Sequence, residues 1–299
     1  MELISQQVSG DPTDTAVDFA TIDHFLNAPE AGVRQVPHQL WGFGGLHGGL
    51  VVAAMAAELR AAEPAGQLRS ISGRLHRSVR DPFTVAVHAD TSTRSTRSYS
   101  TRLLPAATET AGTDAAQTDA AQTDPAGAAA LASATALFGA DAETLGRVFS
   151  PPAPQVPGWR EGELFRPPPS MVPVGGHTEI RALGPHRPFA GGSTPTLTAW
   201  LRMVEDDVVP DELRLLFLVD ALAPSYAATL TSPVGVPTVE LAAHFSGAAA
   251  VSPWVLVEAH TTTATASGWV TETINVWGED RTHLVEARQL RLVRPARTS

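Results

Sequence analysis

The chain has 299 residues and no cysteine, and its 21 basic and 31 acidic residues give a formal net charge of −10 with neutral histidines. A chain of this length can bury two domain cores or one large core. The missing cysteines exclude disulfides, thiolate metal sites and a cysteine nucleophile, and they fit a reducing cytoplasm. The acidic balance argues against nucleic acid or an anionic membrane as a partner.

The first residues, MELISQQVSGDPTDT, contain no basic segment followed by an apolar one, so we expect no secretory signal. No window of about 18 apolar residues occurs, which argues against a membrane-spanning helix. We therefore expect a cytoplasmic protein.

Two apolar segments predict buried helices. Residues 48–61 are apolar on nearly every face and consist mainly of Ala, Val and Leu. Residues 213–226 follow the start signals Pro210 and Asp211, and Pro224 lies near the expected end.

Four strand-like segments follow each helix. They are rich in β-formers, alternate partly between apolar and polar residues, and are separated by Pro, Gly and Asp. They span residues 68–79, 83–95, 97–105 and 128–139 after the first helix, and 237–247, 254–266, 268–280 and 282–294 after the second. A helix followed by four strands lacks the crossovers of a parallel sheet, so we predict a repeated α+β unit, an antiparallel sheet curved around one helix.

This repeat divides the chain into residues 1–149, a connector at 150–173, and residues 174–299. Residues 107–128 include the tandem run TDAAQTDAAQTD (113–124) and are predicted to be a disordered insertion without function. The connector is rich in proline and is predicted to be extended. A spacer explains this composition better than a ligand for a proline-binding domain.

The stretch WGFGGLHGGLVVAAM, residues 41–55, leads a glycine-rich turn into the first helix. It satisfies neither G-x-G-x-x-G nor the P-loop pattern. Two interpretations remain: the glycines allow close packing, or the free N–H groups of the helix start stabilise an oxyanion. His47, in the same turn, is either a structural residue or a general base.

Several common sites lack support. The histidines show no H-E-x-x-H or H-x-x-x-H grouping and the acids have no metal-ligand spacing, so we predict no metal site and no bound cofactor. No G-x-S-x-G occurs, which argues against a serine hydrolase triad.

Asp220 is the one carboxylate within the apolar stretch LRLLFLVDALAPS. We expect the helix to bury it, where an unpaired carboxylate costs several kcal/mol or takes up a proton. It is either satisfied as a structural group or has a chemical role. Alternation in TVELAAHF places Thr238, Glu240 and His244 on one face, and the last strand offers Gln289.

The chain resembles the acyl-CoA thioesterase II family, whose members fuse two hotdog folds in one chain. The resemblance rests on four segments in this order: GGLHGGLVVAAM, LVDALAP, TVELAAHF and ARQL. Each hotdog is a curved antiparallel sheet wrapped around a central helix. The resemblance covers most of the chain, apart from the tail, the 113–124 run and the connector. It implies a hydrolase of lipid metabolism that cleaves acyl-CoA, or a related acyl thioester, to free acid and thiol.

Carried over residue by residue, the Asp, Thr and Gln that activate water in this family fall on Asp220, Thr238 and Gln289. The first half departs, because its helix has no acid before Glu58 and Ala136 occupies the glutamine position. The resemblance therefore implies one hydrolytic site per chain, with the first half lining the acyl pocket.

The implied mechanism is direct hydrolysis with Asp220 as the base, its pKa raised by burial. Backbone N–H groups near the start of the first helix would stabilise the oxyanion, and Gly45, His47 and Gly48 are the candidates there.

Two other functions stay open. One is a non-catalytic acyl-thioester-binding protein on the same fold. The other is a hotdog hydratase or dehydratase, which pairs an acid with a histidine, although no Asp and His share a helix here. Arg74, Arg77 and Arg80 either contact the CoA phosphates or are solvated surface charges. Sheet edges and paired hotdogs are compatible with a homodimer or tetramer.

Overall fold

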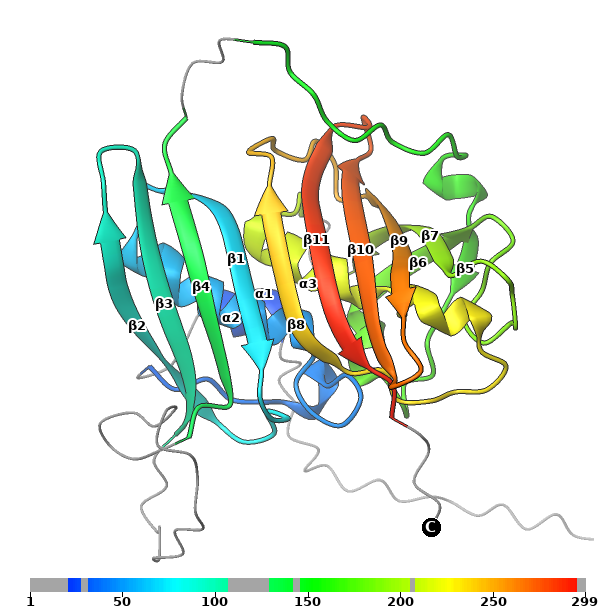
Figure 1. The fold of residues 1–299 in the computed structure, drawn as a ribbon, viewed down its shortest axis with the longest axis horizontal. Coiled ribbons are helices and arrows are strands. Elements are labelled where there is room, and N and C mark those ends of the chain that lie inside the picture. The colour runs from blue at the N-terminus through cyan, green and yellow to red at the C-terminus, as the bar shows by residue number, and fades with distance from the viewer. Residues whose placement is uncertain (1–20, 28–31, 107–128, 142–145, 205–207, 295–299) are drawn as a thin grey trace, which may run out of the picture.

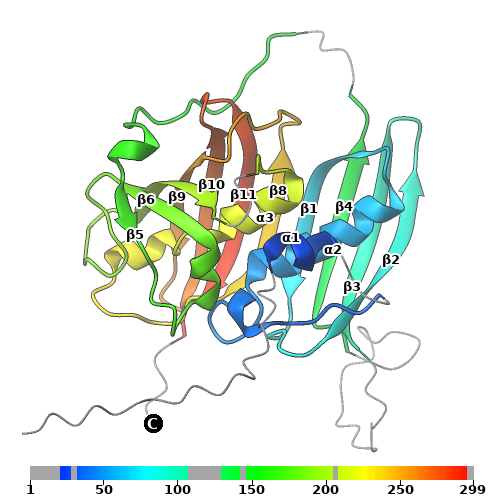
Figure 2. The same ribbon diagram turned by 180° about the vertical axis from the view of Figure 1, so that it is seen from behind.

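The computed structural model describes residues 21–27, 32–106, 129–141, 146–204 and 208–294. The strands are β1 (Gln67–Leu75), β2 (Phe83–Ser92), β3 (Thr96–Pro105), β4 (Ala132–Gly139), β5 (Glu163–Phe165), β6 (Thr178–Leu183), β7 (Thr196–Met203), β8 (Thr238–Phe245), β9 (Val255–Ala264), β10 (Trp269–Gly278) and β11 (His283–Leu292). They form one 11-stranded antiparallel sheet in the order β2-β3-β4-β1-β8-β11-β10-β9-β7-β6-β5. The helices α1 (Ile22–Asn27), α2 (Gly48–Ala62) and α3 (Glu212–Ala221) lie on one face of this sheet (Figure 1 and Figure 2).

The two predicted central helices are present. Helix α2 coincides with the predicted one to within a residue, and Ala, Val and Leu side chains bury most of its surface. Helix α3 begins where expected, because the side chain of Asp211 accepts a hydrogen bond from the Arg214 N–H over 3.0 Å. It ends at Ala221, so the prediction to residue 226 is wrong. Pro224 disfavours helical dihedrals at the preceding residue, and a short 3₁₀ helix, η4 (Ser225–Thr229), follows.

All eight predicted strands are found, and β5, β6 and β7 were not predicted from the sequence. Strand β5 and a 3₁₀ turn, η2 (Trp159–Glu161), lie within residues 150–173, so this connector is not wholly extended. The insertion predicted at 107–128 lies outside the described residues. Within the part of the chain that is described, none of the helices is long and apolar enough to cross a membrane.

The two halves share one sheet and one core. Strands β1 and β8 pair antiparallel from Ser70↔His244 to Arg74↔Glu240, which joins the two sets of strands at their centre. Behind this seam α2 and α3 run antiparallel: Gly49 abuts the end of α3, and Arg60 near the end of α2 pairs with Asp211 over 2.7 Å. The seam therefore brings the start of α2 beside the end of α3.

The same irregularity recurs in both halves. In β1 and β4 the register runs Leu68↔Phe138, then Ser70↔Leu137 and Ile71↔Ala136, which leaves Arg69 as a bulge. In β8 and β11 it runs Thr238↔Arg291, then Glu240↔Leu290 and Leu241↔Gln289, which leaves Val239 as a bulge. These pairs define corresponding positions: Leu68 with Thr238, Ala136 with Gln289, and Phe138 with Arg291.

The outer face of the sheet in the second half carries a separate apolar cluster built around Trp200, Trp254 and Trp277. The connector covers it: the indole N–H groups of Trp200 and Trp277 donate to the carbonyls of Pro157 and Pro151 over 2.9 and 3.0 Å. The proline-rich segment is thus fixed to the sheet by hydrogen bonds as well as by apolar contact.

Candidate active site

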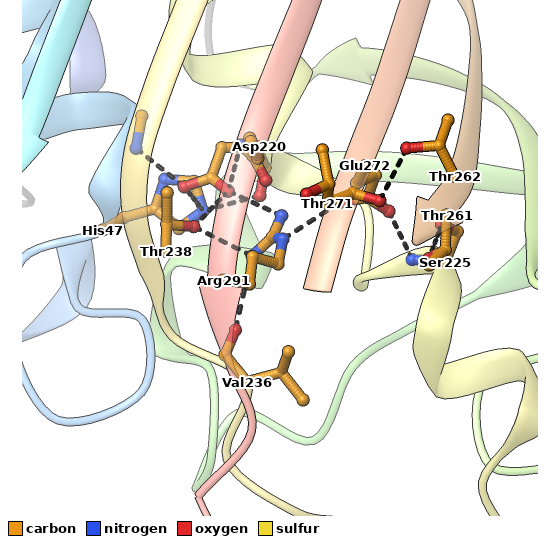
Figure 3. Close-up of polar contacts among 12 residues, drawn as sticks. His47, Asp220, Ser225, Val236, Thr238, Thr261, Thr262, Thr271, Glu272 and Arg291 are labelled. Carbon is orange, nitrogen blue, oxygen red and sulfur yellow. Dashed lines mark hydrogen bonds and ion pairs between the residues drawn. The ribbon is translucent and has the colours of Figure 1, made fainter. Parts of the chain in front are cut away.

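The carboxylate of Asp220 is the centre of a buried polar group at the seam between the halves (Figure 3). It projects from the last turn of α3 and is 8% exposed. The hydroxyl of Thr238, on β8, donates to Oδ1 over 3.2 Å, and the amide of Gln289, on β11, donates to the same oxygen over 2.8 Å. The structure therefore brings together the three residues singled out in the sequence.

Thr238 reaches this group because of the bulge at Val239. Strict alternation placed Thr238 with Glu240 and His244, and that prediction is wrong. The bulge rotates Thr238 to the face of Leu241, toward the helices, whereas Glu240 lies on the outer face and pairs with Arg74 over 3.0 Å. His244 is exposed on that outer face.

The start of α2 closes the other side of the carboxylate. The backbone N–H of Gly49 donates to Oδ2 of Asp220 over 2.8 Å. A Cβ on Gly48 would lie 2.8 Å from the same oxygen, and one on Gly49 would lie 2.6 Å from the carbonyl of Leu216. The close distances agree with the interpretation that these glycines allow close packing of the helices. The N–H of Gly49 binds the carboxylate of Asp220, and stabilisation of an oxyanion by this helix start stays a prediction.

The other residues of the glycine-rich turn are placed differently. Gly45 packs on residues 78 and 79, where a Cβ would lie 2.9 Å from the carbonyl of Val79, and none of its described contacts is with Asp220. Arg80 donates to the carbonyl of Gly44 over 2.7 Å and is exposed, as are Arg74 and Arg77.

His47, the residue before α2, lies against Asp220. Its Nε2–H donates to the backbone carbonyl of Asp220 over 2.9 Å, and Nε2 is 3.6 Å from Oδ2. Burial lowers the pKa of His47, against the opposing influence of the carboxylate, so the ring is neutral near pH 7. With the proton on Nε2, Nδ1 is an acceptor, and among the described residues it has no hydrogen-bond partner.

Arg291 and Glu272 belong to the same group and were missed as site residues. Arg291 lies two residues after Gln289 on the same face of β11, and its Nη2 donates to Oδ1 of Asp220 over 3.1 Å. Its Nε donates to Glu272, on β10, over 2.9 Å. The two-residue spacing from Gln289 was the available signal, because residues two apart on a strand share a face.

The pKa of Asp220 differs from the sequence-based expectation. Burial alone would raise it, but the surrounding positive charge and N–H donors outweigh burial, so the pKa lies below the ordinary aspartate value. The groups that lower it are His47, Arg291, Gln289 and Gly49. The expectation of a raised pKa was wrong because the sequence did not reveal how many donors surround the carboxylate. Asp220 is therefore ionised near pH 7.

The amide of Gln289 is oriented by this anion. Its NH₂ group must face Oδ1 of Asp220, so its carbonyl oxygen, Oε1, points elsewhere. This oxygen is buried and has no partner among the residues that the structure describes. An unsatisfied buried acceptor costs about 1–3 kcal/mol, which points to a donor supplied from outside the protein.

Among its described residues, the first half lacks a comparable group at the corresponding positions. The positions corresponding to Thr238, Gln289 and Arg291 hold Leu68, Ala136 and Phe138. Tyr99 pairs with Ala136 as Glu272 pairs with Gln289, so it takes the position of the acid. The first half thus replaces these four polar positions with three apolar side chains and a tyrosine. Across the described ranges, no three His, Cys, Asp or Glu side chains gather as metal ligands would.

Solved structures share this architecture of two joined hotdogs. A conserved protein of unknown function with a hotdog fold from Alicyclobacillus acidocaldarius has a TM-score of 0.74 at 20% identity, covering 92% of this chain and 98% of that one. Acyl-CoA thioesterase II TesB2 from Mycobacterium marinum has a TM-score of 0.66 at 15% identity, covering 93% and 100%. The tesB protein of Mycobacterium avium subs paratuberculosis has 0.65 at 16%, covering 92% and 98%. The chain is therefore a double hotdog protein.

The second half also matches a family model. Residues 148–293 are similar to the family described as the acyl-CoA thioesterase C-terminal domain. No curated protein sequence matches the chain. The family match of residues 148–293 and the likeness to the two TesB structures confirm the resemblance to acyl-CoA thioesterase II that the sequence motifs indicated.

Proposed function

We propose that this protein hydrolyses acyl thioesters, with acyl-CoA as the substrate class, and that Asp220, Thr238 and Gln289 are its catalytic residues. The observation that carries this proposal is the convergence of a helix carboxylate, a strand hydroxyl and a strand amide from three distant segments. The family match of the second half supports the same reaction class.

The reaction follows from the acceptor capacity of the carboxylate. Within the described residues, Oδ1 of Asp220 receives three donors, whereas Oδ2 receives a single close hydrogen bond, from Gly49. Oδ2 is therefore the oxygen that can accept a proton from water. As that water attacks the thioester carbonyl carbon, its proton passes to Asp220. The tetrahedral intermediate then expels the thiolate, which takes the proton and leaves as thiol.

Two further features support this chemistry. The unpartnered Oε1 of Gln289 can accept the second hydrogen of the attacking water and so fix its direction. The first turn of α2 presents N–H groups that have no partner within a helix, and Gly48 lies in this turn, where a Cβ would be 2.8 Å from Oδ2. The Gly48 N–H is the donor we assign to the developing oxyanion.

A hydratase or dehydratase is the second candidate, because His47 and Asp220 lie 3.6 Å apart. Sequence inspection argued against such a pair since no helix contains both residues, but the seam brings them together from two segments. The Nε2–H of His47 is already engaged with the backbone carbonyl of Asp220, which favours a supporting role over proton transfer.

The test is an assay of the purified protein on acyl-CoA substrates of increasing chain length. Free thiol is detected chemically, enoyl-CoA hydration is followed in parallel by the loss of enoyl absorbance, and Gln289→Leu serves as control. We expect thiol release by the wild type and its loss in the variant. Binding without thiol release would establish the non-catalytic alternative, and hydration without thiol release would establish the hydratase.

A further inference from the structure

Arg291 is a buried cation that touches two of the three proposed catalytic residues, and in the hydrolysis described above it is counted only as one of the three donors to Oδ1. It is 4% exposed. Its Nη2 donates to Oδ1 of Asp220 over 3.1 Å, and its Nη1 donates to the hydroxyl of Thr238 over 2.9 Å. One planar guanidinium thus contacts both the carboxylate and the hydroxyl, which only an arginine can do with fixed geometry.

The guanidinium is itself held from behind. Its Nε donates to Glu272, which is 1% exposed and also accepts a hydrogen bond from the backbone N–H of Ser225. Ser225 follows α3 closely, and its hydroxyl bonds Thr261 over 2.8 Å. Figure 3 shows Arg291 between Asp220 and Glu272. Glu272 therefore connects Arg291 to the segment that also carries Asp220.

Buried charges of this kind are retained only where their partners compensate the loss of water. Here the cation Arg291 lies between two anions, Asp220 and Glu272, so each carboxylate is paired with the guanidinium. The first half has Phe138 and Tyr99 at the positions of Arg291 and Glu272. The first half thus has neither the arginine nor the acid at these positions, and it also has neither threonine nor glutamine at the positions of Thr238 and Gln289.

We propose that Arg291, held in place by Glu272, is a positioning residue that fixes Asp220 and Thr238 and keeps the carboxylate in its ionised form for catalysis. This inference rests on the proposed thioester hydrolysis. Because Arg291 donates to Oδ1, the oxygen of Asp220 that remains able to accept a proton is Oδ2, beside the start of α2. By holding the Thr238 hydroxyl as an acceptor, it also commits the hydroxyl proton to Asp220.

The groups that face Asp220 set the pH dependence of this arrangement. They are His47 before α2, Arg291 on β11 and, behind Arg291, Glu272 on β10. The Coulombic influence of His47 on the pKa of Asp220 requires a protonated ring, and the ring is neutral near pH 7, so at that pH Arg291 supplies the full positive charge in contact with the carboxylate. Without it, burial would favour the protonated acid, and an adjacent opposite charge changes a carboxyl pKa by about 1–3 units. The base would then be lost at mildly acidic pH.

The experiment compares the pH–rate profiles of wild type, Arg291→Lys, and the double variant Arg291→Gln/Glu272→Gln, using a thiol reagent that reports at acidic pH. The double variant removes both charges, which protects the fold from an unpaired Glu272. We expect a wild-type rate that holds down to the pH of unfolding. The double variant should lose about tenfold or more between pH 7 and 5, mainly in kcat. Arg291→Lys should restore the flat profile but not the full rate, since one ammonium cannot hold both partners.

If the rate of the double variant falls no more than that of wild type between pH 7 and 5, the inference is overturned. A second readout is independent of turnover: the carboxyl ¹³C resonance of Asp220, assigned with Asp220→Asn, is titrated in wild type and in the double variant. A pKa that stays low in the variant would overturn the role of Arg291 even if hydrolysis is observed. If the wild type does not hydrolyse acyl thioesters but the titration shifts upward, the proposed function fails while the control of Asp220 by Arg291 stands.

Discussion

The hydroxyl of Thr238 reaches Oδ1 of Asp220 over 3.2 Å because a bulge at Val239 turns Thr238 toward the helices. The corresponding bulge at Arg69 in the first half turns Leu68 to the same face. The backbone irregularity is therefore common to both halves, and the side chain at that position distinguishes the polar site from its apolar counterpart.

Replacing Thr238 by Val keeps the shape of the side chain and removes its hydroxyl. This leaves one donor of Arg291 and one acceptor of Asp220 without a partner, which we expect to cost about 1–3 kcal/mol in the free energy of unfolding. Thiol release should fall about 10-fold to 100-fold, since the carboxylate is held less firmly. Urea unfolding and thiol release measure the two effects. Thr238→Ser retains the hydroxyl and should stay close to wild type; equal losses in both variants would contradict this role.

Gly49→Ala tests the contact between α2 and α3. Its Cβ would lie 2.6 Å from the carbonyl of Leu216 and 3.0 Å from the Cβ of Asp220, so the helices must move apart. Overpacking of this kind costs about 1–3 kcal/mol, and it displaces the N–H that binds Oδ2. The matched control is Gly176→Ala, where a Cβ meets nothing within 4 Å. Similar unfolding midpoints for the two variants would show that the close approach is not required.

His47 should make stability depend on pH. Its ordinary pKa is 6.5 and burial lowers the pKa in the folded protein, so the unfolded chain binds the proton first as pH falls. The stabilisation is complete above pH 6.5 and declines as pH drops toward the lowered value. His47→Gln should reduce the slope of unfolding free energy against pH between 7 and 5. Equal slopes in wild type and His47→Gln would refute this origin.

Binding stoichiometry tests whether the first half holds a second site. Leu68, Ala136 and Phe138 provide no hydrogen bond to a water at the corresponding position. We expect isothermal titration with a non-hydrolysable acyl-CoA ether to give one ligand per chain. Two equivalent ligands per chain would contradict the assignment of a single site.

Much of the fold could be predicted from the sequence because apolar periodicity reports burial directly. The all-apolar faces of residues 48–61 gave α2 almost to the residue, and β-rich segments between turn residues gave eight strands. The missed strands β5, β6 and β7 precede α3, outside the pattern of one helix followed by four strands. Strand β5 consists of three residues shortly before a run of prolines, which is too short for alternation to be recognised.

The site was predictable only in part. Asp220 could be identified because a carboxylate buried in an apolar helix needs a partner or a chemical role, and the family resemblance supplied Thr238 and Gln289. The bulge at Val239 could not be predicted, since alternation has a period of two until the backbone breaks it. The contacts of Arg291 and His47 with Asp220 could not be predicted either. They depend on the seam between β1 and β8, which brings together segments far apart in the chain.

The central claim is that the Asp220 carboxylate activates water for thioester hydrolysis, and the most direct test is the kcat/KM of Asp220→Asn. Loss of a general base costs about 10²–10⁴-fold, so we predict a decrease in that range with circular dichroism and thermal unfolding still those of a folded protein. Glu240→Gln, which changes an acid on the outer face of the sheet, should retain the wild-type rate. A folded Asp220→Asn variant that hydrolyses acyl-CoA as fast as wild type would contradict the account.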